Sequence, residues 1–260
     1  FITHKLREVV EISDRIQVLR NGVVTGRLPA SEATFEKLAV MMVGKEVIPQ
    51  AVRSEAEPGE PILKVKDLYV MSDFGTMAVK GVSFEVRAGE IFGIAGVEGN
   101  GQSELVQAIT GLRRPLKGEI WIKDSNVTAF GPRKLYSLGL SHIPEDKAKF
   151  GLAMNFDLAE NSILGRQWEP QFAGALGRLN WDNILRFTDR IIRSFNVVAP
   201  GIRTPVKSLS GGNQQRLLVG RELSKEPSLV VAAHPTRGLD IASTVYIREL
   251  LIKMRDAGKA

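Results

Sequence analysis

Residues 91–103 of this 260-residue chain read IFGIAGVEGNGQS, an apolar run that passes directly into a glycine-rich turn. The run from Ile91 to Ala95 predicts a buried strand, and apolar residues at helical spacing after the turn predict a helix. Gly96, Gly99 and Gly101 allow a tight turn whose backbone N–H groups converge at the start of that helix, where anions are stabilised. This order predicts a phosphate-binding loop. Such turns also occur without a ligand, so the loop alone leaves both interpretations open.

Two side chains of this loop decide what it can do with a phosphate. Ser103 stands where a hydroxyl would ligate Mg²⁺, and Gln102 stands where such loops usually carry lysine. Glutamine donates a hydrogen bond but cannot neutralise phosphate charge. The candidate cofactor-binding residues of this stretch are Gly96, Gly99, Asn100, Gly101, Gln102, Ser103 and Glu104, with Ser103 also the candidate metal ligand.

On both sides of the loop, the hydrophobic pattern alternates between strands and helices. Residues 62–86 alternate apolar and polar positions, as half-buried strands do. Residues 156–206 are expected to be helical throughout, inserted into the alternating pattern. The remaining predictions are the end of a strand at 1–3, a helix from 6, a hairpin around 21–22, a helix at 34–43, a linker at 49–61, helices at 132–138, 211–225 and 243–257, and strands at 140–143 and 229–233. This is the pattern of an α/β protein with a parallel sheet.

A second motif lies at the start of the helix expected at 211–225. Ser210 is a good N-cap, and Gly211 and Gly212 leave the first backbone N–H groups of the helix unobstructed. Such a helix start can receive an anion from another surface. A plain capped helix is the alternative, but two consecutive glycines are a poor choice for it.

A third motif follows the strand expected at 229–233, where residues 234–240 read HPTRGLD. The order of phosphate loop, Leu-Ser-Gly-Gly and Pro-Thr-x-Gly-Leu-Asp resembles the nucleotide-binding domain of ATP-binding-cassette (ABC) transporters, over essentially all of residues 62–260. The resemblance implies an ABC-type P-loop ATPase, with a parallel core sheet, an antiparallel β subdomain and an inserted helical subdomain. It also implies binding of ATP with Mg²⁺.

Further site residues follow from this resemblance. Glu145 stands where the switch loop of the family usually carries glutamine, and His4 resembles the family's switch histidine. Phe74 is the candidate for stacking on adenine, with Tyr69 as its rival; either could equally be a core aromatic. Asp240 belongs to the loop that crosses between two cassettes.

Three positions depart from the family pattern. Ala233 and His234 replace the aspartate that assists Mg²⁺ and the glutamate that polarises the attacking water, and Gln102 replaces lysine. A methyl group cannot assist a cation, and imidazole is a poor substitute for a carboxylate base. We therefore expect this half to be catalytically impaired.

The positions of these motifs resemble the tandem-cassette ATPases of sugar and nucleoside importers. We expect residues 1–48 to be the C-terminal strand, helix and hairpin of a first cassette, 49–61 a linker, and 62–260 a second cassette that ends before its own switch histidine. Ser210, Gly211 and Gly212 would then act in trans at the first cassette's hydrolytic site. The alternative is a catalytically silent regulatory module that does not bind nucleotide.

The resemblance also implies partners and a location. The partners are the first cassette of the same polypeptide, membrane permease subunits with a contact surface around 157–181, and indirectly a periplasmic or lipoprotein solute-binding protein. Trp168, Phe172 and Trp181 are candidates for the permease contact, with a core role expected for at least one. The location is the cytoplasmic face of the cell membrane, as a peripheral protein.

Composition limits the alternatives. The chain has no cysteine, which excludes disulfides and thiolate metal sites, and no apolar run approaches the roughly 20 residues of a membrane-spanning helix. The 35 Lys and Arg exceed the 29 Asp and Glu by six, but they are scattered, so we expect no nucleic-acid partner. The scattered distribution of Lys and Arg disfavours a third hypothesis, a non-transport ABC ATPase that acts on DNA or ribosomes.

Overall fold

The computed structural model describes residues 1–3, 6–20, 22–44 and 57–260. The chain divides into a smaller unit, residues 1–53 with 238–250, and a larger unit, residues 54–237 with 251–260. His4 and residues 49–56 of the expected linker lie outside the described residues. Residues 57–60 form no helix or strand, and the first strand of the larger unit begins at Pro61.

In the smaller unit, the described part of residues 1–53 forms a hairpin and two helices, and residues 241–250 are the first part of helix α8 (Ile241–Asp256). Helix α1 spans Leu6–Ile12, and strands β1 (Arg15–Arg20) and β2 (Val23–Pro29) pair antiparallel, as the Asn-Gly signal predicts. A 3₁₀ turn at Ala30–Glu32 leads to helix α2, Phe35–Val43. Its core consists of Ile16, Val18 and Leu38 with partly buried neighbours from α1 and α2.

Both expected ends of α2 are confirmed, but the expected strand at 1–3 is wrong. The hydroxyl of Thr34 accepts the Lys37 N–H at 3.2 Å, and Gly44 ends α2 in the left-handed region at φ 85°. Residues 1–3 form no strand, and Phe1 and Ile2 are exposed. A strand is stabilised by pairing, and these residues pair with no other described strand.

An antiparallel sheet forms one part of the larger unit. Its strands are β3 (Pro61–Met71), β4 (Met77–Arg87), β5 (Lys117–Ile122) and β6 (Ser125–Asn126), in the order β4-β3-β5-β6. The buried apolar residues of β3 include Leu63, Val65, Leu68 and Val70, on the face that packs into the core. The antiparallel subdomain is thus confirmed.

The parallel part of the larger unit has two described strands. Strands β7 (Leu140–Ile143) and β8 (Leu229–Ala232) pair in parallel, with Leu140 opposite Leu229. Helices α3 (Gln102–Ile109) and α4 (Pro132–Ser137) precede β7 along the chain. Leu105, Ala108 and Ile109 of α3 are buried, as their spacing predicts.

The expected buried strand at Ile91–Ala95 is wrong. These residues form no strand, and Ile91 and Phe92 are 53% and 43% exposed. The free edge of β8 is bonded instead to Ala260, whose N–H donates to Ser228 and whose carbonyl accepts from Val230. Within the described residues, residues 91–95 therefore have no strand to pair with, and an apolar run without a partner does not form a ladder.

The inserted helical subdomain is confirmed, but the prediction of helix throughout 156–206 is wrong. A single π-helical turn at Lys147–Gly151 leads to helix α5 (Leu158–Ser162); a 3₁₀ turn (Ala175–Gly177), helix α6 (Trp181–Ser194) and a further 3₁₀ turn (Val206–Ser208) follow. Irregular loops at 163–174 and 195–205 separate them, because Gly and Pro interrupt both stretches. Helices α7 (Gly211–Leu223) and α8 (Ile241–Asp256) match their expected positions.

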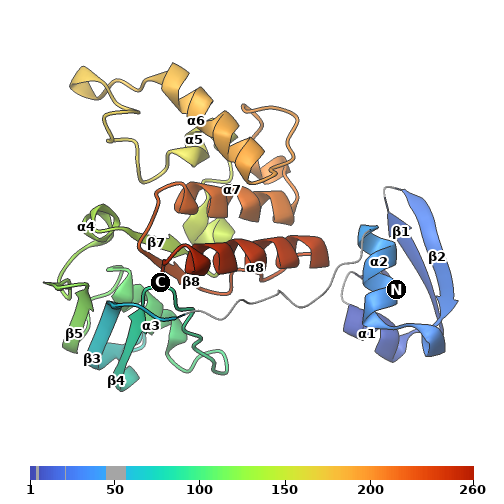
Figure 1. Ribbon diagram of the computed structural model, residues 1–260, viewed down its shortest axis with the longest axis horizontal. Coiled ribbons are helices and arrows are strands. Elements are labelled where there is room, and N and C mark those ends of the chain that lie inside the picture. Colours follow the sequence, from blue (N-terminus) through green and yellow to red (C-terminus); the bar gives the residue numbers. More distant parts are fainter. Residues whose placement is uncertain (4–5, 21, 45–56) are drawn as a thin grey trace. The chain divides into compact units, whose positions relative to one another are not determined.

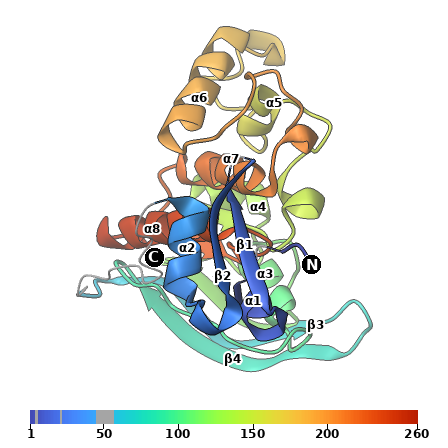
Figure 2. The same cartoon turned by 90° about the vertical axis from the view of Figure 1, so that its right-hand side faces the viewer.

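In the larger unit, the helical subdomain and the antiparallel sheet lie at opposite ends. Helices α5 and α6 lie on one side of α7, and strands β3 and β4 lie at the opposite end, in both views (Figures 1 and 2). Among the described residues, no helix is both long and apolar enough to cross a membrane.

Candidate functional site

The glycine-rich loop meets the start of α3 as a tight turn. Gly101 is the N-cap of α3 at φ 93°, and Gly99 has φ 88°, both in the region that favours glycine. A Cβ on Gly101 would lie 2.4 Å from the carbonyl oxygen of Ala78 in β4. Glycine is therefore required at 101 by its backbone angle and by the close approach of β4.

Gln102 is turned back onto its own loop. Its Nε2 donates to the carbonyl oxygen of Val97 at 3.0 Å, and Nδ2 of Asn100 donates to the same carbonyl at 2.9 Å. A Cβ on Gly96 would lie 2.0 Å from Gln102 Nε2, so Gly96 makes room for this side chain. The amide thus fixes the loop from within, and no side chain of the loop supplies positive charge.

Ser103 and Glu145 are brought together from positions 42 residues apart. The Ser103 hydroxyl donates to Glu145 Oε2 at 3.3 Å, which joins the first turn of α3 to the loop after β7. A hydroxyl and a carboxylate are the oxygen donors that Mg²⁺ prefers, so this pair fits the implied cation. The described residues hold no group of three or more His, Asp or Glu suited to a metal ion.

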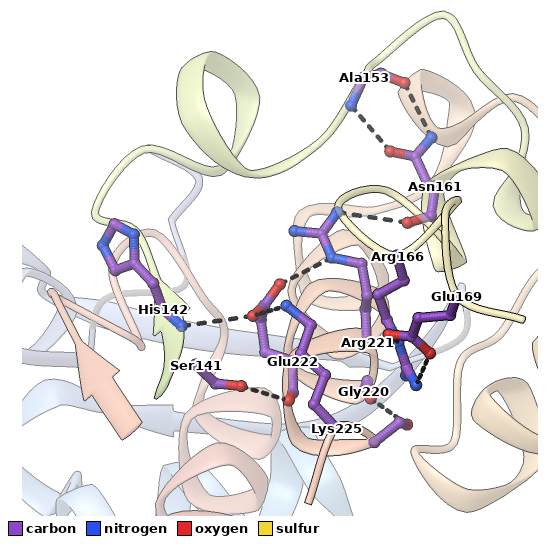
Figure 3. Close-up of polar contacts among 11 residues, drawn as sticks. Ser141, His142, Ala153, Asn161, Arg166, Glu169, Gly220, Arg221, Glu222 and Lys225 are labelled. Carbon is purple, nitrogen blue, oxygen red and sulfur yellow. Dashed lines mark hydrogen bonds and ion pairs between the residues drawn. The ribbon is translucent and has the colours of Figure 1, made fainter. Parts of the chain in front are cut away.

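A buried polar network joins the end of α7 to β7, the strand that precedes Glu145. The Glu222 side chain accepts from Arg221 Nε at 2.9 Å, from Lys225 Nζ at 2.6 Å and from the backbone N–H of His142 at 3.4 Å (Figure 3). Its carbonyl oxygen also accepts from the Ser141 hydroxyl at 2.8 Å. The end of α7 is thereby hydrogen-bonded to Ser141 and His142 of β7, which precede Glu145 by four and three residues.

Burial sets the protonation of two groups in this network. Desolvation lowers the pKa of His142, partly offset by the nearby Glu222 carboxylate, and the imidazole is therefore neutral near pH 7. Desolvation likewise lowers the pKa of Lys225, although Glu222 opposes the effect. The sequence analysis missed this network; the signal that could have found it is the group of charged residues Arg221, Glu222 and Lys225 at the end of a predicted helix.

The second motif forms the start of α7. Ser210 is its N-cap: the hydroxyl accepts from the Asn213 N–H at 3.4 Å and from Asn213 Nδ2 at 3.0 Å. Ser210 is exposed, and the next two residues, Gly211 and Gly212, add no side chain. Gly212 is buried and the Asn213 N–H already donates to Ser210, so the start of this 13-residue helix is only partly open to an anion. No hydrogen bond between this motif and the phosphate loop is found in the described part of the chain.

The third motif follows β8. Ala233 donates its N–H to Ile143, and His234 is exposed with φ 45°, a conformation uncommon for residues other than glycine. Nε2 of Gln215 donates to the Pro235 carbonyl at 2.9 Å, which bonds α7 to this turn. In the larger unit, no carboxylate stands at position 233 or 234 to serve a cation or a water molecule.

The two candidate aromatics differ in their surroundings. Phe74 is 92% exposed in the turn between β3 and β4, four residues before Ala78, whose carbonyl touches Gly101. Lys117 Nζ lies 5.1 Å from the centre of the Tyr69 ring, so that ring already has a cation over its face. Phe74 is therefore the better candidate for stacking on a base.

Asp240 caps the last helix. Its carboxylate accepts the Ser243 N–H and the Ser243 hydroxyl, both at 2.9 Å. This contact gives Asp240 a local role at the start of α8. Of the three candidate permease contacts, Phe172 is buried at 1% exposure, while Trp168 and Trp181 are partly exposed beside Arg133 and Arg203.

These features define the class of the protein. The ABC transporter family model matches residues 79–237, which is more than half of the chain, and the chain belongs to this family as an ATP-binding domain. The α/β P-loop ATPase fold agrees with the same assignment, and membership implies binding of a nucleotide, ATP.

Relatives of this chain include import ATP-binding proteins. It is 39% identical over 259 residues to the nucleoside import ATP-binding protein NupA of Lactococcus lactis, covering 100% of this chain and 51% of the relative. It is 40% identical to the guanosine import ATP-binding protein NupO of Bacillus subtilis, covering 96% and 49%. It is 32% identical to the ribose import ATP-binding protein RbsA of Clostridium tetani, covering 100% and 50%. The chain spans about half the length of these relatives.

Solved structures agree on the fold. A dimeric ATP-binding cassette in a post-hydrolysis state with ADP and Pi matches with a TM-score of 0.64 at 23% identity, covering 76% of this chain and 85% of the other. A nucleotide-free ATP-binding cassette of an ABC transporter matches with a TM-score of 0.62 at 19% identity, covering 77% and 79%.

Proposed function

We propose that this chain is part of the ATP-binding subunit of an ABC importer for simple sugars or nucleosides. Support comes from the relatives, whose names give nucleoside, guanosine and ribose import. The single observation that carries the binding role is the loop at 96–103, closed by glycines at the start of α3, with Ser103 in contact with Glu145.

In this proposal residues 62–260 form a degenerate second cassette. Gln102, Ala233 and His234 stand where phosphoryl transfer needs a cation, a metal-assisting carboxylate and a base. Ser210, Gly211 and Gly212 form the capped start of α7, of which Ser210 is exposed, and in this proposal they complete a hydrolytic site on a first cassette of the same polypeptide. Residues 1–48, with His4, would be the tail of that first cassette, and Asp240 would lie in the loop between the two.

The nucleotide would be held by this chain's own groups. The backbone N–H groups of the loop from Gly96 to Glu104 would bind phosphate oxygens, and Ser103 with Glu145 would hold Mg²⁺. Phe74 would stack on the base. Mg²⁺ supplies the positive charge that the loop itself lacks.

The remaining partners follow from the importer role. Membrane permease subunits would contact the helical subdomain around residues 157–181, and a periplasmic or lipoprotein solute-binding protein would act through them. The location would be the cytoplasmic face of the membrane, without a nucleic-acid partner.

A second candidate is a catalytically silent module that donates its signature without binding nucleotide. The observation that favours it is the Gln102 amide, which bonds to its own loop rather than facing outward. A calorimetric titration of the chain with Mg-ATP separates the two. Micromolar binding supports the ATP-holding cassette; no binding up to millimolar ATP supports the silent module.

We expect no steady ATP turnover by this chain alone, because each missing catalytic group costs on the order of 10²-fold or more in rate. Phosphate release is measured at millimolar Mg-ATP, with Ser103→Ala as the control for contaminating ATPases. Turnover that the Ser103→Ala change abolishes would contradict the assignment of a degenerate site.

We expect binding of ATP to depend on Mg²⁺ because of Glu145. Without the cation, this carboxylate and the phosphates repel each other, so ATP should bind about tenfold more weakly in EDTA than in Mg²⁺. In Glu145→Gln the neutral amide removes the repulsion, and the ratio of the two affinities should shrink. Glu60→Gln, an exposed site, is the matched control. An unchanged ratio in Glu145→Gln would show that Glu145 does not face the phosphates.

A further inference from the structure

Asn100 and Gly101 form an asparagine–glycine pair in the glycine-rich loop. Asn100 is exposed, whereas Gly101 is buried and packs against β4. The fold requires glycine at 101, because the φ of 93° favours it and a Cβ would lie 2.4 Å from the carbonyl oxygen of Ala78. The backbone nitrogen that follows the exposed Asn100 side chain therefore belongs to a residue without a side chain to shield it.

Hydrogen bonds hold Asn100 but not the backbone nitrogen that follows it. The backbone N–H and Nδ2 of Asn100 donate to the Val97 carbonyl oxygen at 3.2 and 2.9 Å, and Gln102 Nε2 donates to the same oxygen at 3.0 Å. The backbone N–H of Gly101 donates to no acceptor among the described residues. No hydrogen bond to those residues therefore has to break before the Gly101 nitrogen can react.

We propose that Asn100 is a site of spontaneous deamidation, which converts it to aspartate and isoaspartate. The Gly101 nitrogen, after losing its proton to water, forms a bond to Cγ of Asn100. The Cγ–Nδ2 bond breaks, and Nδ2 takes up a proton and leaves as ammonia. Water then opens the cyclic imide at the bond from the Gly101 nitrogen to Cγ, which gives aspartate, or at the bond to the backbone carbonyl carbon, which gives isoaspartate. Overall, an amide and a water molecule give a carboxylic acid and ammonia.

Either product adds a negative charge to a loop that has no positive side chain. The consequence for nucleotide rests on the proposed function: a carboxylate at 100 repels the phosphates of ATP. Isoaspartate also lengthens the backbone by a methylene group, in a turn where Gly101 is fixed against Ala78. Conversely, a bound phosphate that accepts the Gly101 N–H should slow the reaction. An empty loop would thus lose affinity for ATP with age, and an occupied loop would be protected.

Peptide mapping by mass spectrometry measures the conversion without nucleotide, so its outcome is separate from that of the ATP titration. The folded chain is incubated at neutral pH, sampled over time and digested with trypsin, and the sample taken at the start corrects for conversion during digestion. Asn100 is the single asparagine of peptide 88–113, and Asn126, also exposed, is that of peptide 124–133. We expect Asn100 to convert about tenfold faster, because the β-branched Val127 crowds the nitrogen that follows Asn126. Equal rates would overturn the site.

Two matched variants test the consequence for nucleotide. Asn100→Asp carries the charge of the product and should bind Mg-ATP about tenfold more weakly than the wild type. Asn126→Asp makes the same change at an exposed site outside the loop and should leave the affinity unchanged. Saturating Mg-ATP should also slow the conversion of the wild type. Equal affinities of Asn100→Asp and the wild type would overturn the effect on nucleotide, whereas a wild type that binds no Mg-ATP would contradict the proposed function and leave the mass measurement to decide the site.

Discussion

A lysine in place of Gln102 should tighten binding of Mg-ATP, and a glutamate there should nearly abolish it. The three side chains have similar reach but carry charges of +1, 0 and −1 beside the phosphates. A charge-assisted hydrogen bond contributes about 1.5–3 kcal/mol, so we expect Gln102→Lys to raise affinity by about tenfold to a hundredfold. Glutamate adds repulsion and also loses the donor that holds Val97, so its effect should be at least as large in the other direction.

Calorimetric titration with Mg-ATP measures the whole series. Gln167→Lys and Gln167→Glu make the same charge changes at an exposed position outside the loop and should alter affinity little. Thermal unfolding of each variant checks that the larger unit stays folded. If the affinity were the same for all three residues at 102, the loop would not face the phosphates. If none of the three bound Mg-ATP, the silent-module alternative would stand.

Replacing Glu222 with alanine should destabilise the larger unit by about 3–5 kcal/mol, the cost of leaving a buried ion pair without one partner. Glu222 is 1% exposed and accepts from both Arg221 and Lys225, whose side chains are 7% and 12% exposed. Its removal leaves the side chains of Arg221 and Lys225 without this carboxylate and removes the acceptor of the His142 backbone N–H. Of the two hydrogen bonds described above between α7 and β7, only the one from the Ser141 hydroxyl to the backbone carbonyl of residue 222 would remain.

Urea unfolding followed by tryptophan fluorescence reports on this unit, because all three tryptophans of the chain lie in it. Glu222→Gln keeps the shape and removes the charge, so it should fall between the wild type and Glu222→Ala. Glu60→Ala, at an exposed site of the same unit, is the control and should change stability by less than about 0.5 kcal/mol. Equal midpoints for Glu222→Ala and Glu60→Ala would show that the buried network contributes nothing to stability.

Local patterns predicted most of the elements. The helix at α2 was predicted with both ends, because Thr34 and Gly44 carry the capping chemistry in their own side chains and backbone angles. Strands β7 and β8 and helix α7 were also predicted, since each is a short, strongly patterned run. The predicted helical stretch at 156–206 was too long, because periodicity alone does not show where loops that contain Gly and Pro interrupt the helices.

The sequence predicts the residues of the candidate site but not the contacts between them. The positions of Ser103 and Glu145 were assigned from motifs, but their hydrogen bond depends on the α3 start meeting the loop after β7. The inward turn of Gln102 and the neutral state of His142 likewise depend on neighbours that no local pattern contains.

By itself, the sequence determined the order of the motifs, the absence of lysine at 102 and of carboxylates at 233 and 234, and the capping residues, because these are properties of single positions and their spacing. Only the tertiary structure decided that Ile91–Ala95 pairs with no described strand, that Glu222 bonds α7 to β7 and that Arg166 Nη1 has no hydrogen-bond partner within the described residues. Pairing, burial and hydrogen bonding between distant residues are properties of the folded chain, since each needs a partner that sequence spacing does not specify.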